Sequence, residues 1–171
     1  MPHRSSALAL ILALLTASAG AQAPSFAGVW VLDSTAAGGA LAADAGGYRS
    51  VLTIMQLDTA VVVERRLVDR ARRPVAEPER LSYRLDDRER TVAWTAPSGA
   101  RGTASVRARR VADAPAIVLV TVRRMPVAPE RTRTTQLLER LELAPGGRLK
   151  VTRTEFDGRR ERRRVYWFSR G

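Results

Sequence analysis

The feature that most constrains the fold is a series of short apolar and β-branched runs, nearly every one followed closely by a turn signal. β-Branched and aromatic residues favour strands, whereas clusters of Gly, Pro, Asn and Asp end them. Asp157-Gly158 is the strongest hairpin signal, and residues 97–99 (PSG) and 145–147 (PGG) mark further turns. The runs predict about ten strands, at residues 28–33, 51–57, 60–67, 81–85, 91–95, 103–111, 117–122, 132–143, 149–156 and 161–169.

This succession of hairpins predicts an antiparallel meander with no long helix. A meander of this length leaves flat exposed edges unless it closes. We therefore expect a single all-β domain, an antiparallel up-and-down β-barrel, with a β-sandwich as the alternative architecture. The Ala/Gly-rich residues 34–47 are expected to form a loop at the barrel mouth, residues 70–78 an interior loop, and Pro126 and Pro129 a loop before the strand at 132–143.

The N-terminal residues have the composition of an export signal. A short basic start precedes a wholly apolar run at residues 7–15 and small residues at 16–21. This is the order of regions in a secretory signal peptide, and the apolar run is shorter than the roughly 20 residues of a membrane-spanning helix. We predict a signal peptide at residues 1–21, cleaved after Ala21, and a barrel domain at residues 22–171 that works in the periplasm or is secreted.

The side-chain inventory excludes several kinds of chemistry. The chain has no cysteine, and its one histidine, His3, lies in the predicted signal peptide. Disulfides, thiolate catalysis, Cys/His zinc sites, histidine-ligated haem and His-dependent triads therefore lack their atoms. Of the close carboxylates, Asp86 and Asp87 lie at a predicted hairpin tip, and Glu139 and Glu142 lie on opposite faces of one strand, so neither set makes a catalytic pair. We expect no enzyme activity, no cofactor and no metal.

The charge balance is strongly basic. There are 29 basic and 17 acidic side chains, a formal net charge of +12, and Lys150 is the only lysine. The densest basic run, residues 159–164 (RRERRR), is followed closely by aromatic residues, a pattern that also occurs in polyanion-binding proteins. Because arginines are spread along the chain, we interpret the charge mainly as a solvated surface. Arginines interrupt both faces of several strands, which disfavours a lipid-facing barrel wall. We expect weak polyanion binding through surface arginines, no specific nucleic acid, no transmembrane span and a monomer.

Two short motifs carry a resemblance to known barrels. Residues 26–32 read F-x-G-x-W-x-L, which resembles the first strand of the calycin barrels: the lipocalins, the fatty-acid-binding proteins and the lipocalin-like proteins that bacteria export. The resemblance implies that Gly28 lets the chain bend near the barrel floor and that Trp30 plugs that end. Arg164-Val165-Tyr166 looks like the Arg-x-Tyr of the last strand of fatty-acid-binding proteins, where both side chains point inward and hold a ligand carboxylate.

The orientation of the last strand stays open at this point. Period two places Arg164, Tyr166 and Phe168 on one face, and Val165 and Trp167 on the other. If the first face is interior, the buried guanidinium requires a carboxylate from the protein or from a ligand. If it is solvated, the second face packs inward and the motif has no ligand.

These observations lead to two hypotheses about function. The first is an exported, non-catalytic binding protein for a small apolar or anionic amphiphilic ligand inside the barrel. In it, Arg164 serves as charge partner, Tyr166 as hydrogen-bond donor and Trp30 as floor. The alternative is an envelope-surface or interaction protein that uses its outer arginines on acidic polymers and has a packed interior.

Overall fold

The computed structural model describes residues 25–33, 48–96, 98–158 and 160–171. The predicted signal peptide and the predicted mouth loop at residues 34–47 lie outside these residues. The described residues form ten strands and no helix. The strands are β1 (Gly28–Leu32), β2 (Arg49–Gln56), β3 (Ala60–Val68), β4 (Glu79–Arg84), β5 (Arg90–Thr95), β6 (Arg101–Arg110), β7 (Ala116–Ala128), β8 (Arg131–Ala144), β9 (Arg148–Asp157) and β10 (Arg160–Arg170).

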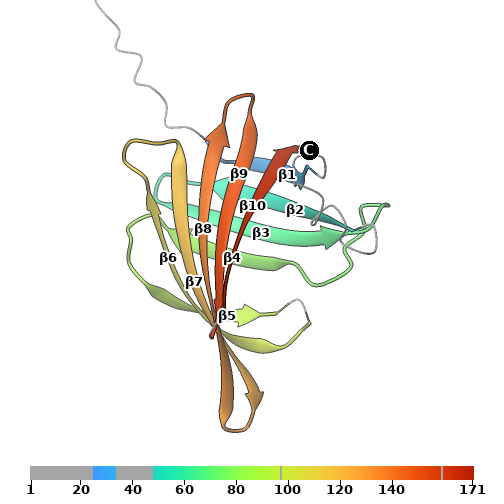
Figure 1. Cartoon of the computed structure of the whole chain (residues 1–171), viewed down its shortest axis with the longest axis vertical. Coiled ribbons are helices and arrows are strands. Elements are labelled where there is room, and N and C mark those ends of the chain that lie inside the picture. Colours follow the sequence, from blue (N-terminus) through green and yellow to red (C-terminus); the bar gives the residue numbers. More distant parts are fainter. Residues whose placement is uncertain (1–24, 34–47, 97, 159) are drawn as a thin grey trace, which may run out of the picture.

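All ten strands belong to one antiparallel sheet in the order β4-β3-β2-β1-β10-β9-β8-β7-β6-β5. The first and last strands pair, with Trp30 opposite Arg170 and Leu32 opposite Phe168. The edge strands β4 and β5 follow one another in sequence but form no ladder with each other in the described part of the chain. β1–β4 cross β7–β10 at a steep angle, so the sheet curls into a nearly closed barrel (Figure 1). The predicted all-β up-and-down barrel is confirmed.

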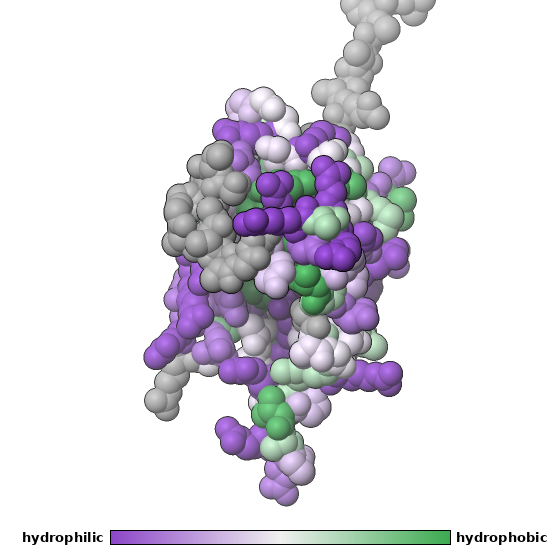
Figure 2. All heavy atoms as spheres, turned by 90° about the vertical axis from the view of Figure 1, so that its right-hand side faces the viewer, coloured by the Kyte–Doolittle hydropathy of each residue, from purple (hydrophilic) through white to green (hydrophobic). Residues whose placement is uncertain are grey.

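The alternation of side chains along each strand decides which of them face the barrel interior, and β4 shows it most regularly. Along β4, Glu79, Leu81 and Tyr83 are buried, whereas Arg80, Ser82 and Arg84 are exposed. Successive strand residues point to opposite faces of a sheet, so one face of each strand builds the core and the other meets solvent. Hydrophilic side chains cover much of the face in Figure 2, with smaller apolar areas between them.

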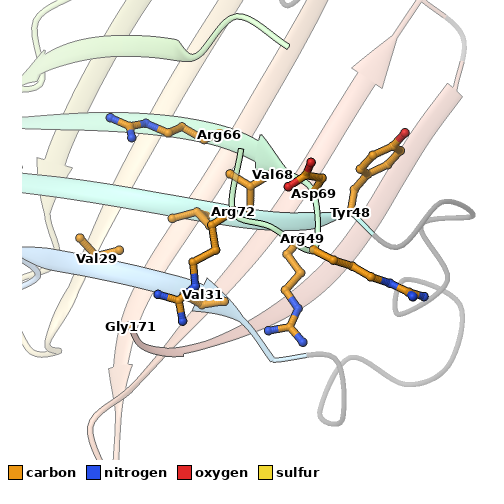
Figure 3. Close-up of a pocket in the computed structure, with 11 residues that line it drawn as sticks. Val29, Val31, Tyr48, Arg49, Arg66, Val68, Asp69, Arg72 and Gly171 are labelled. Carbon is orange, nitrogen blue, oxygen red and sulfur yellow. The ribbon is translucent and has the colours of Figure 1, made fainter. Parts of the chain in front are cut away.

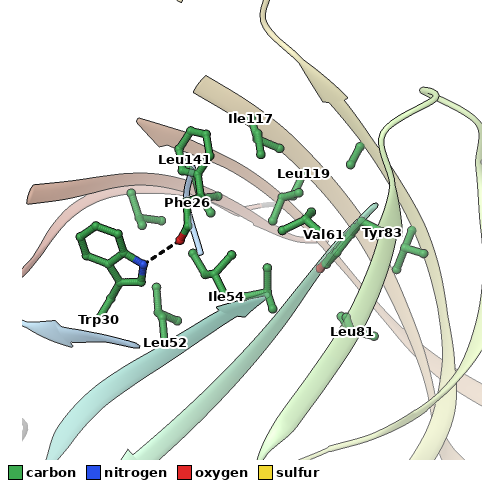
Figure 4. Packing of buried hydrophobic residues seen from close by; sticks show 14 of the residues in the cluster. Phe26, Trp30, Leu52, Ile54, Val61, Leu81, Tyr83, Ile117, Leu119 and Leu141 are labelled. Atoms are coloured by element: carbon green, nitrogen blue, oxygen red, sulfur yellow. Dashed lines mark hydrogen bonds between the residues drawn. The ribbon is translucent and has the colours of Figure 1, made fainter. Parts of the chain in front are cut away.

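Trp30 and Phe26 belong to the apolar core (Figure 4). The Trp30 side chain is fully buried, and its Nε1 donates a hydrogen bond to the Phe26 carbonyl at 2.9 Å. The Arg170 guanidinium stacks over the Trp30 ring, 4.8 Å from its centroid. Gly28 has a φ of 144°, and a Cβ there would lie 3.2 Å from Arg170 Nη1. The positive φ and the close approach of Arg170 explain why glycine stands at position 28.

The hairpin of β7 and β8 extends further than predicted. We expected a strand that ends at residue 122 and then a loop containing Pro126, but β7 continues to Ala128. The hairpin protrudes from the barrel (Figure 1), and its register shifts between Pro126 and Ala128. Proline has no N–H to give to a ladder and is accommodated at such irregularities, so its presence did not end the strand.

Candidate functional site

The orientation of β10 resolves the alternative that the sequence left open. Phe168 is 3% exposed, whereas Val165 on the opposite face is 39% exposed. The interior face is therefore the one that carries Arg164, Tyr166 and Phe168. Burial decreases along this face away from the core: Tyr166 is half-buried and Arg164 is exposed.

Five charged side chains continue the apolar interior faces of other strands. Each lies two residues from a buried apolar or hydroxyl-bearing residue on its own strand, as Glu139 lies between Leu137 and Leu141 on β8. We call these five residues the interior cluster: Arg65 on β3, Glu79 on β4, Arg123 on β7, Glu139 on β8 and Arg153 on β9. Their strands belong to both walls of the barrel, so the cluster spans its interior.

Glu139 is the most deeply buried member of the interior cluster, at 1% exposure. Arg153, its register partner on β9, donates from Nε at 2.9 Å and approaches with Nη2 at 2.8 Å. Arg65 reaches the other carboxylate oxygen from the opposite wall. Burial alone would raise the pKa of Glu139, but the charges of Arg65, Arg153 and Arg123 outweigh it and lower the pKa to about 2. Glu139 is therefore ionised at neutral pH.

Glu79 connects the two edge strands that share no ladder. Trp94 on β5 donates from Nε1 to Glu79 Oε1 at 2.8 Å. Arg123 forms an ion pair with the same oxygen, and its guanidinium stacks over the Trp94 ring at 5.2 Å. On the other oxygen, Arg65 Nη1 lies 3.5 Å away. Side chains thus bridge β4 and β5 where backbone hydrogen bonds do not.

The interior cluster has an excess of positive charge, since three guanidiniums face two carboxylates. Two of its buried N–H-bearing atoms, Arg65 Nη1 and Arg123 Nε, have no hydrogen-bond partner among the described residues. Burial lowers the pKa of Arg123, Glu79 opposes that effect, and the neighbouring Arg65 adds to it. A buried donor without an acceptor costs on the order of 1–3 kcal/mol. An anion that enters the interior cluster can accept hydrogen bonds from these two atoms and balance the excess positive charge.

Arg153 connects the interior cluster to the predicted ligand residues. It is the register partner of Arg164, and its guanidinium stacks over the Tyr166 ring at 5.4 Å. The structure therefore brings Arg164 and Tyr166 beside the interior cluster. Trp30 lies instead in the apolar core, with which Tyr166 is also in contact.

The interior cluster was not predicted from the sequence. Glu139 was weighed there only as a possible catalytic partner of Glu142. The two side chains do lie on opposite faces of β8, and Glu142 pairs with Arg140 and Lys150. A local signal existed: a single charged residue inside an apolar face of period two, as in Leu137-x-Glu139-x-Leu141. Such a residue needs a buried partner, but the sequence does not indicate which strand supplies it.

In the described ranges, no set of three or more Cys, His, Asp or Glu side chains is placed to hold a metal ion. Those ranges also contain no helix with the length and apolar character needed to cross a bilayer.

The fold and the site define a nearly closed, ten-stranded up-and-down β-barrel with a charged cluster in its interior. No protein-family model matches the sequence, and no curated protein matches it either. Among solved structures, the chain is similar to a fatty acid binding protein of Schistosoma mansoni in complex with arachidonic acid. The identity is 11%, the match covers 87% of this chain and 98% of that chain, and the TM-score is 0.49. At this identity few side chains are shared, so the ligand of that protein does not identify one for this chain.

Proposed function

We propose that the barrel binds a small anionic amphiphile whose anionic group is received by the interior cluster. The observation that carries this proposal is the excess of guanidinium in the interior cluster. Arg123 Nε has no hydrogen-bond partner among the described residues, and Arg65 Nη1 has only its ion-pair partner Glu79 Oε2, 3.5 Å away. A carboxylate complements them because guanidinium and carboxylate make charge-assisted, often bidentate hydrogen bonds. The apolar part of the ligand would contact side chains at the edge of the core, such as Val92 and Met125, which are half-buried.

The residues predicted from sequence keep their roles in this proposal. Arg164, on the interior face of β10, serves as the outer charge partner, and Tyr166 beside it donates a hydrogen bond. Trp30 forms the apolar floor at the core. We infer binding rather than catalysis, because Glu139 is held ionised by its arginines and has a pKa far from that of a general acid or base at neutral pH.

We also propose that the chain is exported, to the periplasm or beyond the cell. The support is the apolar run at residues 7–15 with its small-residue cleavage region. Expression of the full chain in a bacterium and mass measurement of the purified product test this. A product that begins at Gln22 is expected, and an intact N-terminus in a cytoplasmic fraction would contradict export.

The binding proposal is tested with dodecanoate and dodecanol, which differ only in the charged group. Trp94 is the reporter, because its indole contacts both Glu79 and Arg123. Dodecanoate is expected to change the fluorescence and to bind about tenfold more tightly than dodecanol, the difference that one charge-assisted hydrogen bond supplies. Similar affinities for the two probes would overturn the proposal.

Two variants locate the bound carboxylate. Arg164→Gln is expected to weaken dodecanoate binding severalfold to about tenfold and to leave dodecanol binding unchanged. Arg163→Gln is the matched control: Arg163 is the preceding residue, is exposed and faces the opposite side of β10. Equal losses in both variants would show that Arg164 acts only through the net charge of the protein.

A further inference from the structure

A second pocket lies outside the barrel, on the outer face of β1, β2 and β3 (Figure 3). Its volume is about 710 Å³, within the usual range of small-molecule sites. Val29, Val31 and Val51 line it. Because these valines alternate along their strands with the buried Trp30 and Leu52, they face away from the interior cluster.

The pocket has an apolar floor. Val29 is 45% exposed although β1 is paired on both sides, and Val31 and Val51 are half-buried next to it. Val68, at the end of β3, completes the floor under the following turn. Because Val29 is exposed and Val31 and Val51 beside it are half-buried, the floor offers a small apolar surface to hydrocarbon.

The rim of the pocket is cationic. Arg49, Arg66, Arg70 and Arg72 line it, against one aspartate, Asp69. Arg66 forms an ion pair with a neighbouring glutamate on its own strand. In the part of the chain that the structure describes, the other three arginines have no carboxylate within ion-pair distance.

The negative charge of Asp69 does not balance the arginines of the rim, because Arg73 already pairs with this carboxylate. The backbone N–H and the Nε of Arg73 each donate to it at 2.9 Å. These contacts, with the backbone hydrogen bond foremost, lower the pKa of Asp69. Asp69 and Arg73 thus form a local pair that stabilises the turn after β3.

Arg72 occupies a backbone conformation that normally suits glycine. Its φ is 63°, in the left-handed region, and its N–H donates to the Asp69 carbonyl at 3.0 Å. The Asp69 N–H in turn donates to the Arg73 carbonyl at 2.9 Å, so the turn is held from both ends. Figure 3 shows the Arg72 side chain running from this turn across the pocket toward Val31. The turn therefore positions a guanidinium over the apolar floor.

We propose that this outer pocket binds a phosphorylated amphiphile. The guanidiniums of Arg49, Arg70 and Arg72 take the phosphate, whose several oxygens and up to two negative charges match several arginines better than one carboxylate does. The valine floor takes the hydrocarbon next to the phosphate. The site is separate from the one proposed inside the barrel, from which the sheet divides it.

The test uses dihexanoyl phosphatidic acid below its aggregation concentration, with calorimetry as the readout. Dihexanoyl phosphatidylcholine, which has the same chains and no net charge, and inorganic phosphate are the comparison probes. Phosphatidic acid is expected to bind at least about tenfold more tightly than either. Phosphatidylcholine brings a cationic choline to the arginine rim and has one fewer ionisable phosphate oxygen, and inorganic phosphate has no hydrocarbon for the valine floor. Equal binding of inorganic phosphate would show an adventitious anion only and would overturn the proposal.

The double variant Arg49→Gln/Arg72→Gly removes two rim charges without straining the turn, since glycine adopts a φ of 63° readily. Phosphatidic acid binding is expected to fall about tenfold or more. The matched control is Arg109→Gln/Arg162→Gln, which removes two exposed arginines elsewhere. An equal loss of phosphatidic acid affinity in the control would show that only the net charge of the protein matters, and it would contradict the proposed outer site.

A third variant separates the two proposed sites. Arg123→Gln changes the interior cluster and is expected to leave phosphatidic acid binding as it is. If Arg123→Gln abolishes this binding and the rim variant does not, the phosphate enters the barrel and the outer site is wrong. The rim variant should in turn keep its affinity for dodecanoate, so the failure of one proposal does not decide the other.

Discussion

Glu139 on β8 forms ion pairs with Arg65 on β3 and Arg153 on β9, next to the end of the apolar core. Arg153 reaches it from the neighbouring strand and Arg65 from the opposite wall. Ion pairs buried in this way contribute little net stability compared with apolar packing, but the removal of one partner leaves uncompensated charge. Replacing Glu139 is therefore expected to lower the free energy of unfolding by more than the ion pairs themselves contribute to it.

We expect Glu139→Gln to destabilise the protein by about 3–5 kcal/mol near neutral pH, because three guanidiniums would lose a buried anion. Denaturant unfolding followed by circular dichroism measures this. Glu142→Gln is the matched control on the same strand, since its arginine and lysine partners lie toward solvent and such pairs contribute about 0–1 kcal/mol. Equal stabilities of Glu139→Gln and the wild type would contradict the role of Glu139.

The pH dependence of stability follows from the same carboxylate. The pKa of Glu139 falls from an ordinary 4.5 to about 2 in the folded chain, so its contribution is complete above about 4.5 and is lost as the pH falls toward 2. The melting temperature of the wild type should decrease across this window. Glu139→Gln should show a flatter profile there, and parallel profiles would contradict the assignment.

The positions of the strands can be predicted from local sequence, but the contacts between interior side chains of different strands cannot. The β-branched runs and turn dipeptides predicted all ten strands, since a half-buried strand needs only alternation and a stop signal. The inward face of β10 could not be predicted, because Tyr166 and Phe168 compete with Val165 and Trp167. The cluster around Glu139 could not be predicted either, because Arg65, which contacts Glu139, comes from a strand far away in the sequence.

The gap between β4 and β5 is bridged by one tryptophan. Trp94→Phe keeps an aromatic side chain, although a smaller one, and removes the Nε1 hydrogen bond to Glu79, which leaves a buried carboxylate with one donor fewer. We expect a loss of about 1–3 kcal/mol and faster amide hydrogen exchange in both edge strands. Trp167→Phe, on the outer face and stacked against Arg148, is the control. Unchanged exchange in β4 and β5 would show that the bridge does not hold the gap.

The net charge of +12 is a property of the whole surface as well as of the two proposed sites. Hydrophilic side chains are spread over the face seen in Figure 2. We expect weak retention on immobilised heparin that is lost at moderate salt, because exposed charges are screened beyond a Debye length of about 10 Å at 0.1 M salt. Retention that persists at high salt would contradict a diffuse surface and indicate a dedicated polyanion site.

In the proposed complex, the excess guanidinium inside the barrel receives the anionic group of the ligand. Titration of carboxyl-¹³C dodecanoate bound to the protein, followed by its carbonyl chemical shift in NMR, tests this directly. If Arg65, Arg123 and Arg164 surround the bound carboxylate, its pKa lies clearly below that of free dodecanoate, and Arg164→Gln moves it upward. A bound carboxylate whose pKa equals or exceeds that of free dodecanoate would show that the guanidiniums do not receive it.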